Sequence, residues 1–227
     1  MKSHKTITTI NRCVIYIILL ALAAFMLMPF AWMVLSSLKE ADDVFTYDMT
    51  WLPKKISFTG YHRAVTQQPF LMYGLNTVLV SVIITSIQLC TSVLAGYAFA
   101  RLEFPGRNIV FMIYLSAMMI PHQAMIIPSF ILIRKLGLID SYGGLTLPFL
   151  AGPFGAFLMR QFFLSMPKSL EEAAVIDGCS RVKVLLKIVL PLSKPALATL
   201  GLFTFMNAWN DFMWPLIITN SVKMRTL

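Results

Sequence analysis

The segment SLEEAAVIDGCSRVKVLLKIVLPLSKP, Ser169–Pro195, packs charges, a glycine and two prolines between two long apolar runs. Ser169 and Glu172 match a capping box, in which each side chain accepts a hydrogen bond from the backbone of the other. Gly178 suits the left-handed residue that ends a helix, and prolines close a second helix that starts at about Ser180. The second helix has apolar residues at helical spacing, which predict one buried face: Val182, Leu185, Leu186 and Val189. The segment therefore predicts a helix–glycine–helix hairpin.

The apolar runs around this hairpin set the class of the protein. Of its 227 residues, 58% are hydrophobic and 13% are charged, whereas soluble domains carry about 25% charged residues. A helix needs about 20 apolar residues to cross a bilayer. The chain is therefore predicted to be an all-α, polytopic membrane protein with one transmembrane domain over residues 1–227 and a cytoplasmic loop over 167–192. The predicted spans are 13–35, 70–100, 108–133, 142–160 and 195–218.

The basic residues indicate orientation. The formal net charge is +9, but lysines and arginines flank the spans and do not alternate with exposed aromatic residues, so no nucleic-acid partner is expected. They are more numerous on the side that carries the N-terminus and residues 167–192. This bias predicts that both are cytoplasmic.

The hairpin itself has two interpretations. An amphipathic hairpin can lie on lipid headgroups, although Glu171, Glu172 and Asp177 would then face anionic lipid. Alternatively, the small side chains of Ala173 and Ala174 allow close approach by a protein partner. Composition and spacing leave both interpretations open.

The spacing of Glu172-Ala173-Ala174, Gly178, Ile188 and Leu190-Pro191 resembles the EAA loop of ABC importer permeases. Cys179 stands where that family usually has alanine. Other segments resemble the carbohydrate-uptake, maltose-permease-like branch of the family, so that the resemblance covers nearly the whole chain. These segments are Ser36–Lys39, Ala95–Arg101, Phe104–Arg107, Ile120–Gln123, Leu136–Leu138, Gly144–Pro148, Trp209–Asn210 and Trp214–Leu216.

This resemblance implies a type I ABC importer transmembrane domain in the bacterial inner membrane that carries a sugar or polyol by alternating access. Its implied partners are cytoplasmic ATP-binding-cassette ATPase subunits, a second homologous permease, a periplasmic or lipoprotein binding protein, and membrane lipid. The implied ATPase-coupling residues are Glu172, Ala173, Ala174, Asp177, Gly178, Ile188, Leu190 and Pro191.

The chain is expected to be non-catalytic. It has no G-x-x-x-x-G-K-[ST] motif, so ATP and Mg²⁺ are expected on the partner subunit and no cofactor on this chain. The family usually has a sixth span after the segment that corresponds to Val222–Leu227. The resemblance thus implies that this chain ends before its last span and assembles poorly by itself.

Polar side chains within the apolar runs are candidates for the solute pathway, because such groups need partners or water. Near His122, a bend at Pro121 fits either a pathway or local repair of the helix. Asp211 lies roughly 24 Å along a helix from Pro195, which favours an interfacial acid over a solute contact. The candidates are Asn76, Gln88, Tyr97, His122, Gln123, Asn207, Asn210 and Asp211.

Two other functions are less well supported. An ATP-independent secondary transporter or channel would need ionisable pairs near the middle of the membrane, and the spans contain few. An enzyme or metal site would need clustered reactive groups, whereas the histidines and cysteines lie in separate regions. These residues are His4, His62, His122, Cys13, Cys90 and Cys179.

Overall fold

The computed structural model describes residues 2–44 and 50–227, and within them every regular element is helical. The chain divides into two compact units, Met1–Phe70 and Leu71–Leu227. The first unit contains α1 (Lys2–Ser37), α2 (Ala41–Val44) and α3 (Thr59–Gln67). Within α1, Val14–Ser37 is long and apolar enough to cross a membrane, in agreement with the first predicted span. Near its end, Trp32 packs edge-on against Trp51 with ring centroids 5.2 Å apart.

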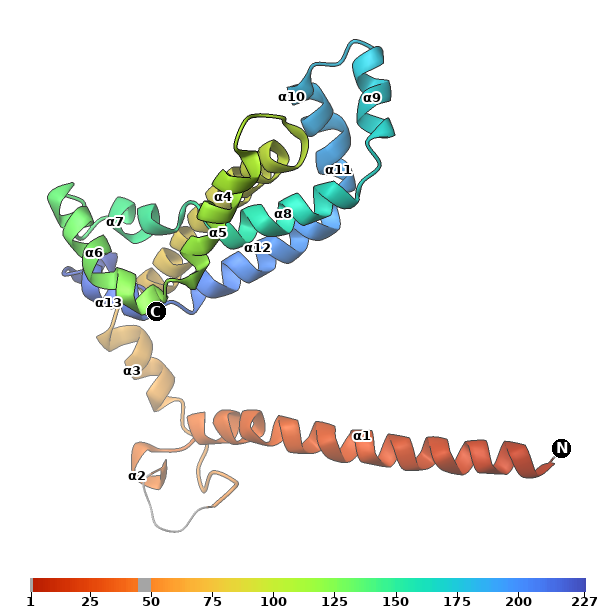
Figure 1. The fold of residues 1–227 in the computed structure, drawn as a ribbon. Helices are drawn as coiled ribbons and strands as arrows, with labels where there is room; N and C mark the ends of the chain where they lie inside the picture. The colour runs from red at the N-terminus through yellow and green to blue at the C-terminus, as the bar shows by residue number, and fades with distance from the viewer. Residues whose placement is uncertain (1, 45–49) are drawn as a thin grey trace. The chain divides into compact units, whose positions relative to one another are not determined.

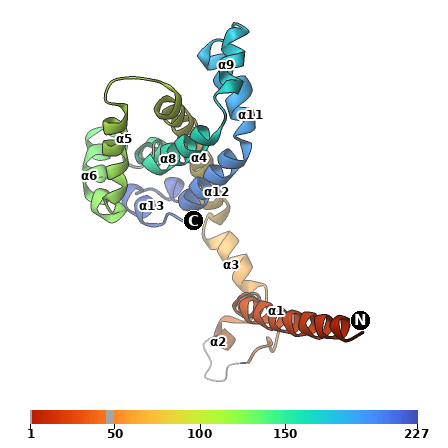
Figure 2. The same cartoon turned by 45° about the vertical axis from the view of Figure 1, so that its right-hand side comes forward.

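The second unit holds the remaining helices. Figures 1 and 2 show α9 to α11 at one end of this unit and α6 and α13 at the other, with α4, α8 and α12 between them. Its elements are α4 (Phe70–Arg101), α5 (Arg107–Ser116), η1 (Ala117–Met119), α6 (His122–Lys135), α7 (Tyr142–Thr146), η2 (Leu147–Phe149), α8 (Pro153–Ser165), α9 (Ser169–Ile176), α10 (Arg181–Val184), the π-helical η3 (Leu185–Val189), α11 (Leu190–Leu192), α12 (Lys194–Trp209), α13 (Met213–Ile218) and η4 (Val222–Met224).

One predicted span of this unit is a continuous helix and three are not. Helix α4 covers the predicted 70–100. The predicted 108–133 turns by 100° between η1 and α6, because Pro121 has no N–H and forces Ile120 into an extended conformation. The predicted 142–160 bends by 46° before α8, where Gly152 is extended, and α8 continues to Ser165.

The predicted span 195–218 is also interrupted. Helix α12 ends at Trp209, and α13 is a separate helix that starts at Met213. Trp214 of α13 is buried and donates its indole N–H to the Gly144 carbonyl of α7 at 3.0 Å. Helix α13 therefore packs beside α6 and α7 instead of extending α12.

Asp140 fastens the end of α13 to the connector between α6 and α7. Its N–H donates to the Ile218 carbonyl at 2.9 Å, and its carboxylate accepts from the backbone N–H groups of Ser221 and Asn220 at 2.9 Å each. These hydrogen bonds lower the pKa of Asp140, and those from Ser221 have the largest effect. They also hold it at a φ of 57°, which an aspartate tolerates better than most residues.

Small residues bring α4 and α8 into close contact. Gly96 of α4 lies against Ala156 and Met159, and Gly155 of α8 lies against the Ser92 side chain. All of these residues are buried. Small residues at such a crossing let two backbones approach closely, which is a common way to pack helices in membranes.

The contact predicts that Gly96→Ala destabilises the protein. A Cβ at Gly96 would lie 2.7 Å from the Met159 Cβ and 3.0 Å from the Arg160 backbone nitrogen, so the helices must separate. We expect a loss of about 1–3 kcal/mol in the free energy of unfolding, measured as a lower thermal midpoint in detergent. The matched control is Gly74→Ala in the same helix, where the nearest atom would be 3.7 Å away. Equal midpoints for the two variants would contradict the prediction.

Candidate functional site

The predicted hairpin is present. Helix α9 ends in a Schellman motif, in which the N–H of Cys179 donates to Ala174 O at 2.9 Å and that of Gly178 donates to Val175 O at 3.0 Å. Gly178 has a φ of 80°, and a Cβ there would meet only open space. The prediction of a left-handed glycine between two helices is thus confirmed. Ser180 then caps the second helix by accepting from the Lys183 N–H at 3.4 Å.

The predicted capping box does not form. Helix α9 already includes Ser169, its N-cap is Lys168, and no side chain caps it. The Lys168 carbonyl instead accepts from the N–H groups of Glu171 and Glu172 at 2.9 and 3.0 Å. Because Ser169 lies inside the helix, its hydroxyl is not placed to bond the N–H groups of the first turn.

The predicted apolar face of the second helix is only half correct. Leu185 and Val189 are buried, but Val182 and Leu186 are 67% and 57% exposed, and Val184 is buried in their place. The cause is the π-helical turn η3, whose wider spacing puts residues five apart, such as Val184 and Val189, on one face. This wide turn precedes Pro191, which has no N–H for a normal helical hydrogen bond.

An ion pair joins the hairpin to the end of α4. The Arg101 Nε lies 2.5 Å from Glu171 Oε1, and the two side chains are only 6% and 13% exposed. The Tyr97 hydroxyl donates to the other Glu171 oxygen at 3.2 Å, and Arg101 Nη2 donates to the Met166 carbonyl at 3.0 Å. Both the carboxylate and the guanidinium therefore have several partners.

The sequence does not predict this ion pair, and it makes Tyr97 a candidate for the solute pathway instead. The one sequence feature that could have suggested the pair is that both charges lie on the side predicted to be cytoplasmic. Their separation of 70 residues gave no reason to pair them.

The coupling candidates differ in exposure. Ala174 is buried in the core, and Ile188 and Leu190 are half-buried. The others lie on the surface: Glu172, Ala173, Asp177, Gly178 and Pro191. Beside them Ile176 is 86% exposed and Val175 is 54% exposed. A concavity of about 440 Å³ lies between this surface and the end of α4, and the hairpin lines it with apolar, acidic and basic groups, the last being Lys168 and Arg181.

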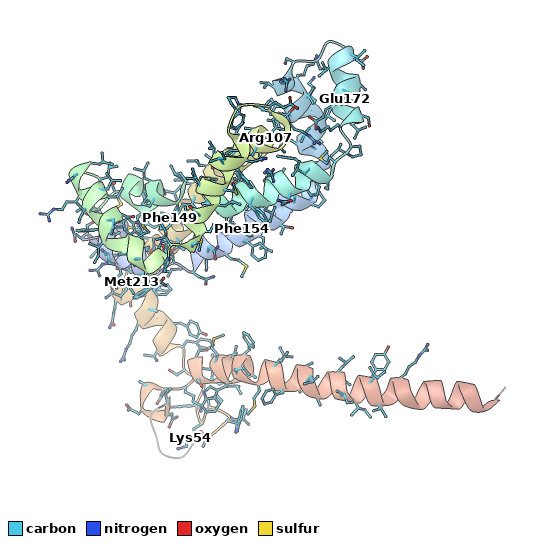
Figure 3. The ribbon with its side chains drawn as sticks, viewed as in Figure 1. Lys54, Arg107, Phe149, Phe154, Glu172 and Met213 are labelled. Atoms are coloured by element: carbon cyan, nitrogen blue, oxygen red, sulfur yellow. The ribbon has the colours of Figure 1, made fainter. Side chains whose placement is uncertain are left out.

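Four of the solute-pathway candidates meet at a second cavity of about 600 Å³: Gln88, His122, Asn207 and Asp211. They come from α4, α6, α12 and the break after α12. His122 stacks on Phe149, with ring centroids 5.5 Å apart. Figure 3 shows Phe149 and Phe154, which line this cavity, well away from Glu172 on the hairpin.

The other candidates lie outside this cavity. Asn76 is buried, donates to the carbonyls of Lys223 and Arg225 at 2.8 Å each, and accepts from the Tyr142 hydroxyl at 2.7 Å. Asn210 bonds the Met206 carbonyl at 2.7 Å, and Gln123 is exposed. In the described residues, no three His, Cys, Asp or Glu side chains gather closely enough to hold a metal ion.

Residues 89–227 match the family of binding-protein-dependent transport system inner membrane components. The chain belongs to this family. It is 34% identical to the sulfoquinovosyl glycerol transport system permease protein SmoH of Agrobacterium fabrum, in an alignment that covers 88% of this chain and 71% of the relative. It is 33% identical to the arabinooligosaccharides transport system permease protein AraQ of Bacillus subtilis, in an alignment that covers the whole of this chain and 82% of the relative.

A third relative is the sn-glycerol-3-phosphate transport system permease protein UgpE of Yersinia pestis, 38% identical over 82% of this chain and 69% of the relative. Among solved structures, a bacterial ABC transporter involved in the import of the acidic polysaccharide alginate aligns with a TM-score of 0.83 at 29% identity. The alignment covers 95% of this chain and 76% of that one. This member of the family is thus a permease subunit of an ABC importer, a transport component of the inner membrane.

The ion pair predicts that Glu171→Ala destabilises the permease, because Arg101 would keep its charge in a buried place without a carboxylate. We expect a loss of about 3 kcal/mol or more in the free energy of unfolding, measured by thermal unfolding in detergent. The control is Glu172→Ala, one residue further along α9, whose exposed side chain should change stability by less than about 0.5 kcal/mol.

A double variant separates the charge from the packing. Arg101→Met with Glu171→Met removes both buried charges together and should recover most of the stability that Glu171→Ala loses. A double variant as unstable as the single one would show that the ion pair is not the cause.

Proposed function

We propose that this permease carries a carbohydrate or a related polyol across the inner membrane by alternating access. Cytoplasmic ATPase subunits drive it, a second homologous permease completes the pathway, and a periplasmic or lipoprotein binding protein delivers the solute. The relatives support the solute class, since their names include arabinooligosaccharides and sulfoquinovosyl glycerol. The family description supports dependence on a binding protein.

The hairpin is the proposed docking site for the ATPase. Ile176 and Val175 are 86% and 54% exposed and line the same concavity as Glu172, and exposed apolar side chains that lie together mark a surface that a partner covers. Glu172 stands among them and is proposed to pair with a basic residue of the partner. The exposed basic residues of the hairpin, such as Lys183 and Lys187, would also suit anionic headgroups, so the proposed docking rests on the exposed apolar side chains beside Glu172 and not on the charge of the surface. We place the N-terminus on the same, cytoplasmic side.

The ion pair gives this docking site a mechanical connection. Arg101 is the last residue of α4, and Gln88 of the same helix lines the cavity. The two residues are 13 positions apart, or roughly 20 Å along a helix. A movement of α9 is thus proposed to reach the cavity through α4 as a rigid body.

The cavity is the proposed share of this chain in the solute pathway. Its volume of about 600 Å³ lies within the usual range for small-ligand sites, about 300–1,000 Å³. It combines amide, imidazole and carboxylate groups with the rings of Phe149, Phe154 and Phe203. The single observation that carries the proposed function is the hairpin, with its left-handed Gly178 and its exposed apolar and acidic surface.

The proposal predicts that Glu172→Ala reduces ATP-dependent solute uptake at least about tenfold while membrane insertion is kept. Uptake is measured in cells that express the whole transporter and is normalised to the amount of permease in the membrane. The matched control is Glu103→Ala, since Glu103 is another exposed acid, in the loop after α4. Full uptake by the Glu172 variant, or equal losses in both variants, would count against ATPase docking here.

A backbone variant tests the turn between the helices. Proline holds φ near −65°, whereas Gly178 needs 80°, so Gly178→Pro should reorient the second helix and abolish uptake. Gly137 offers the same change elsewhere, because it also ends a helix in a Schellman motif, with a φ of 71°. If Gly178→Pro keeps as much uptake as Gly137→Pro does, a coupling role for the turn at Gly178 is contradicted.

A further inference from the structure

The charge of the solute is a question that the names of the relatives leave open, since they include both arabinooligosaccharides and sn-glycerol-3-phosphate. The cavity of this chain has a definite chemistry. We propose that its solute is uncharged and that Asp211 excludes anionic solutes from the cavity. This inference rests on the proposed function, because it takes the cavity to be part of the solute pathway.

The polar groups of the cavity suit hydroxyl groups. Gln88 and Asn207 each offer an amide donor and acceptor, Thr204 offers a hydroxyl and Asp211 offers a carboxylate. Among the described residues that line the cavity there is no lysine or arginine. A phosphate, sulfonate or carboxylate on the solute would therefore meet a carboxylate and find no guanidinium or ammonium to neutralise it, whereas sites for such groups normally use Arg or Lys.

The Asp211 carboxylate is held in place and is not neutralised by an ion pair. Its Oδ1 accepts from the backbone N–H of Trp214 at 3.3 Å, at the start of α13. In the described part of the chain, no lysine, arginine or histidine forms an ion pair with it, and the imidazole of His122 in the same cavity is the basic group that interacts with it electrostatically. The residue is half-buried, so its charge is screened less than it would be on the open surface.

The same carboxylate is favourable for an uncharged polyol. A carboxylate accepts stronger hydrogen bonds from hydroxyls than a neutral acceptor does. Around it, aromatic rings from three regions supply the apolar surface: Phe154 packs edge-on against Phe203 at 6.4 Å, and Phe149 stacks on His122. Apolar walls with a few placed polar groups are typical of sites that orient a small neutral ligand.

A purely structural role for Asp211 can be separated from charge exclusion. As a structural residue, Asp211 needs only an oxygen that accepts the Trp214 N–H. Asp211→Asn keeps such an oxygen in the same place and removes the negative charge. This variant therefore tests the charge and spares the hydrogen bond that fixes the start of α13.

The test measures how fast charged and uncharged probes reach the cavity. Asn207→Cys places a thiol there, in a chain in which Cys13, Cys90 and Cys179 are replaced by serine. The thiol is treated in membranes with an anionic methanethiosulfonate (sulfonatoethyl) and with an uncharged one (hydroxyethyl). Comparing the ratio of the two rates with and without Asp211→Asn cancels the intrinsic reactivity of each reagent.

We expect Asp211→Asn to raise the anionic-to-uncharged rate ratio by about fivefold or more, because removing a nearby charge favours the anion. The cation-to-uncharged ratio, measured with the trimethylammonioethyl reagent, should fall in the same variant. A smaller change in the first ratio, or a change in both ratios in the same direction, would overturn the inference.

Uptake separates a failure of this inference from a failure of the proposed function. If the wild-type transporter takes up labelled sn-glycerol-3-phosphate and Glu172→Ala abolishes this, the inference is wrong and the proposed function stands. The absence of such uptake agrees with the inference. Solute uptake that Glu172→Ala leaves unchanged would contradict the proposed function, while the rate ratios at Asn207→Cys would still decide the charge of the cavity.

Discussion

The ion pair between Arg101 and Glu171 fixes the position of the hairpin relative to the membrane-spanning helices. It is nearly buried and joins the last residue of α4 to the first turn of α9. Since successive residues on a helix point about 100° apart, an inward Glu171 turns Glu172 outward. The pair thereby decides which of two adjacent acids belongs to the core and which lies on the surface.

Breaks in the helices, more than the helices themselves, form the cavity. His122 is the first residue of α6 after the turn at Pro121, Gly152 lies in the break before α8, and Asp211 lies in the break between α12 and α13. Non-helical backbone at membrane depth is tolerated where it borders protein or a water-filled space. Three such breaks meet at one place, and there the polar side chains find both room and partners.

Two helices connect the hairpin with the cavity. Helix α4 runs from the ion pair at Arg101 past Gln88, and α12 runs from the end of the hairpin at Lys194 to Asn207. Helix α8 packs against both of them through buried small and apolar residues. Such close packing resists deformation within the layer, which is a physical basis for transmitting movement from one end of this unit to the other.

The sequence by itself determined the all-α membrane class, the left-handed Gly178, the bend at Pro121 and the spacing of the hairpin, because each depends on the properties of residues within a few positions of one another. It did not determine that Ser169 lies inside α9, that a π-helical turn shifts the buried face to Val184, or that α13 leaves α12. It also listed Asn76 and Tyr97 as equal pathway candidates, and it favoured an interfacial position for Asp211, which instead lines the cavity. Only the tertiary structure separated them, into a bond to the C-terminal segment, a bond to Glu171 and a place in the cavity. The reason is physical: these roles depend on partners 70 or more residues away, or on breaks that converge in space, and such pairings leave no periodic signal along the chain.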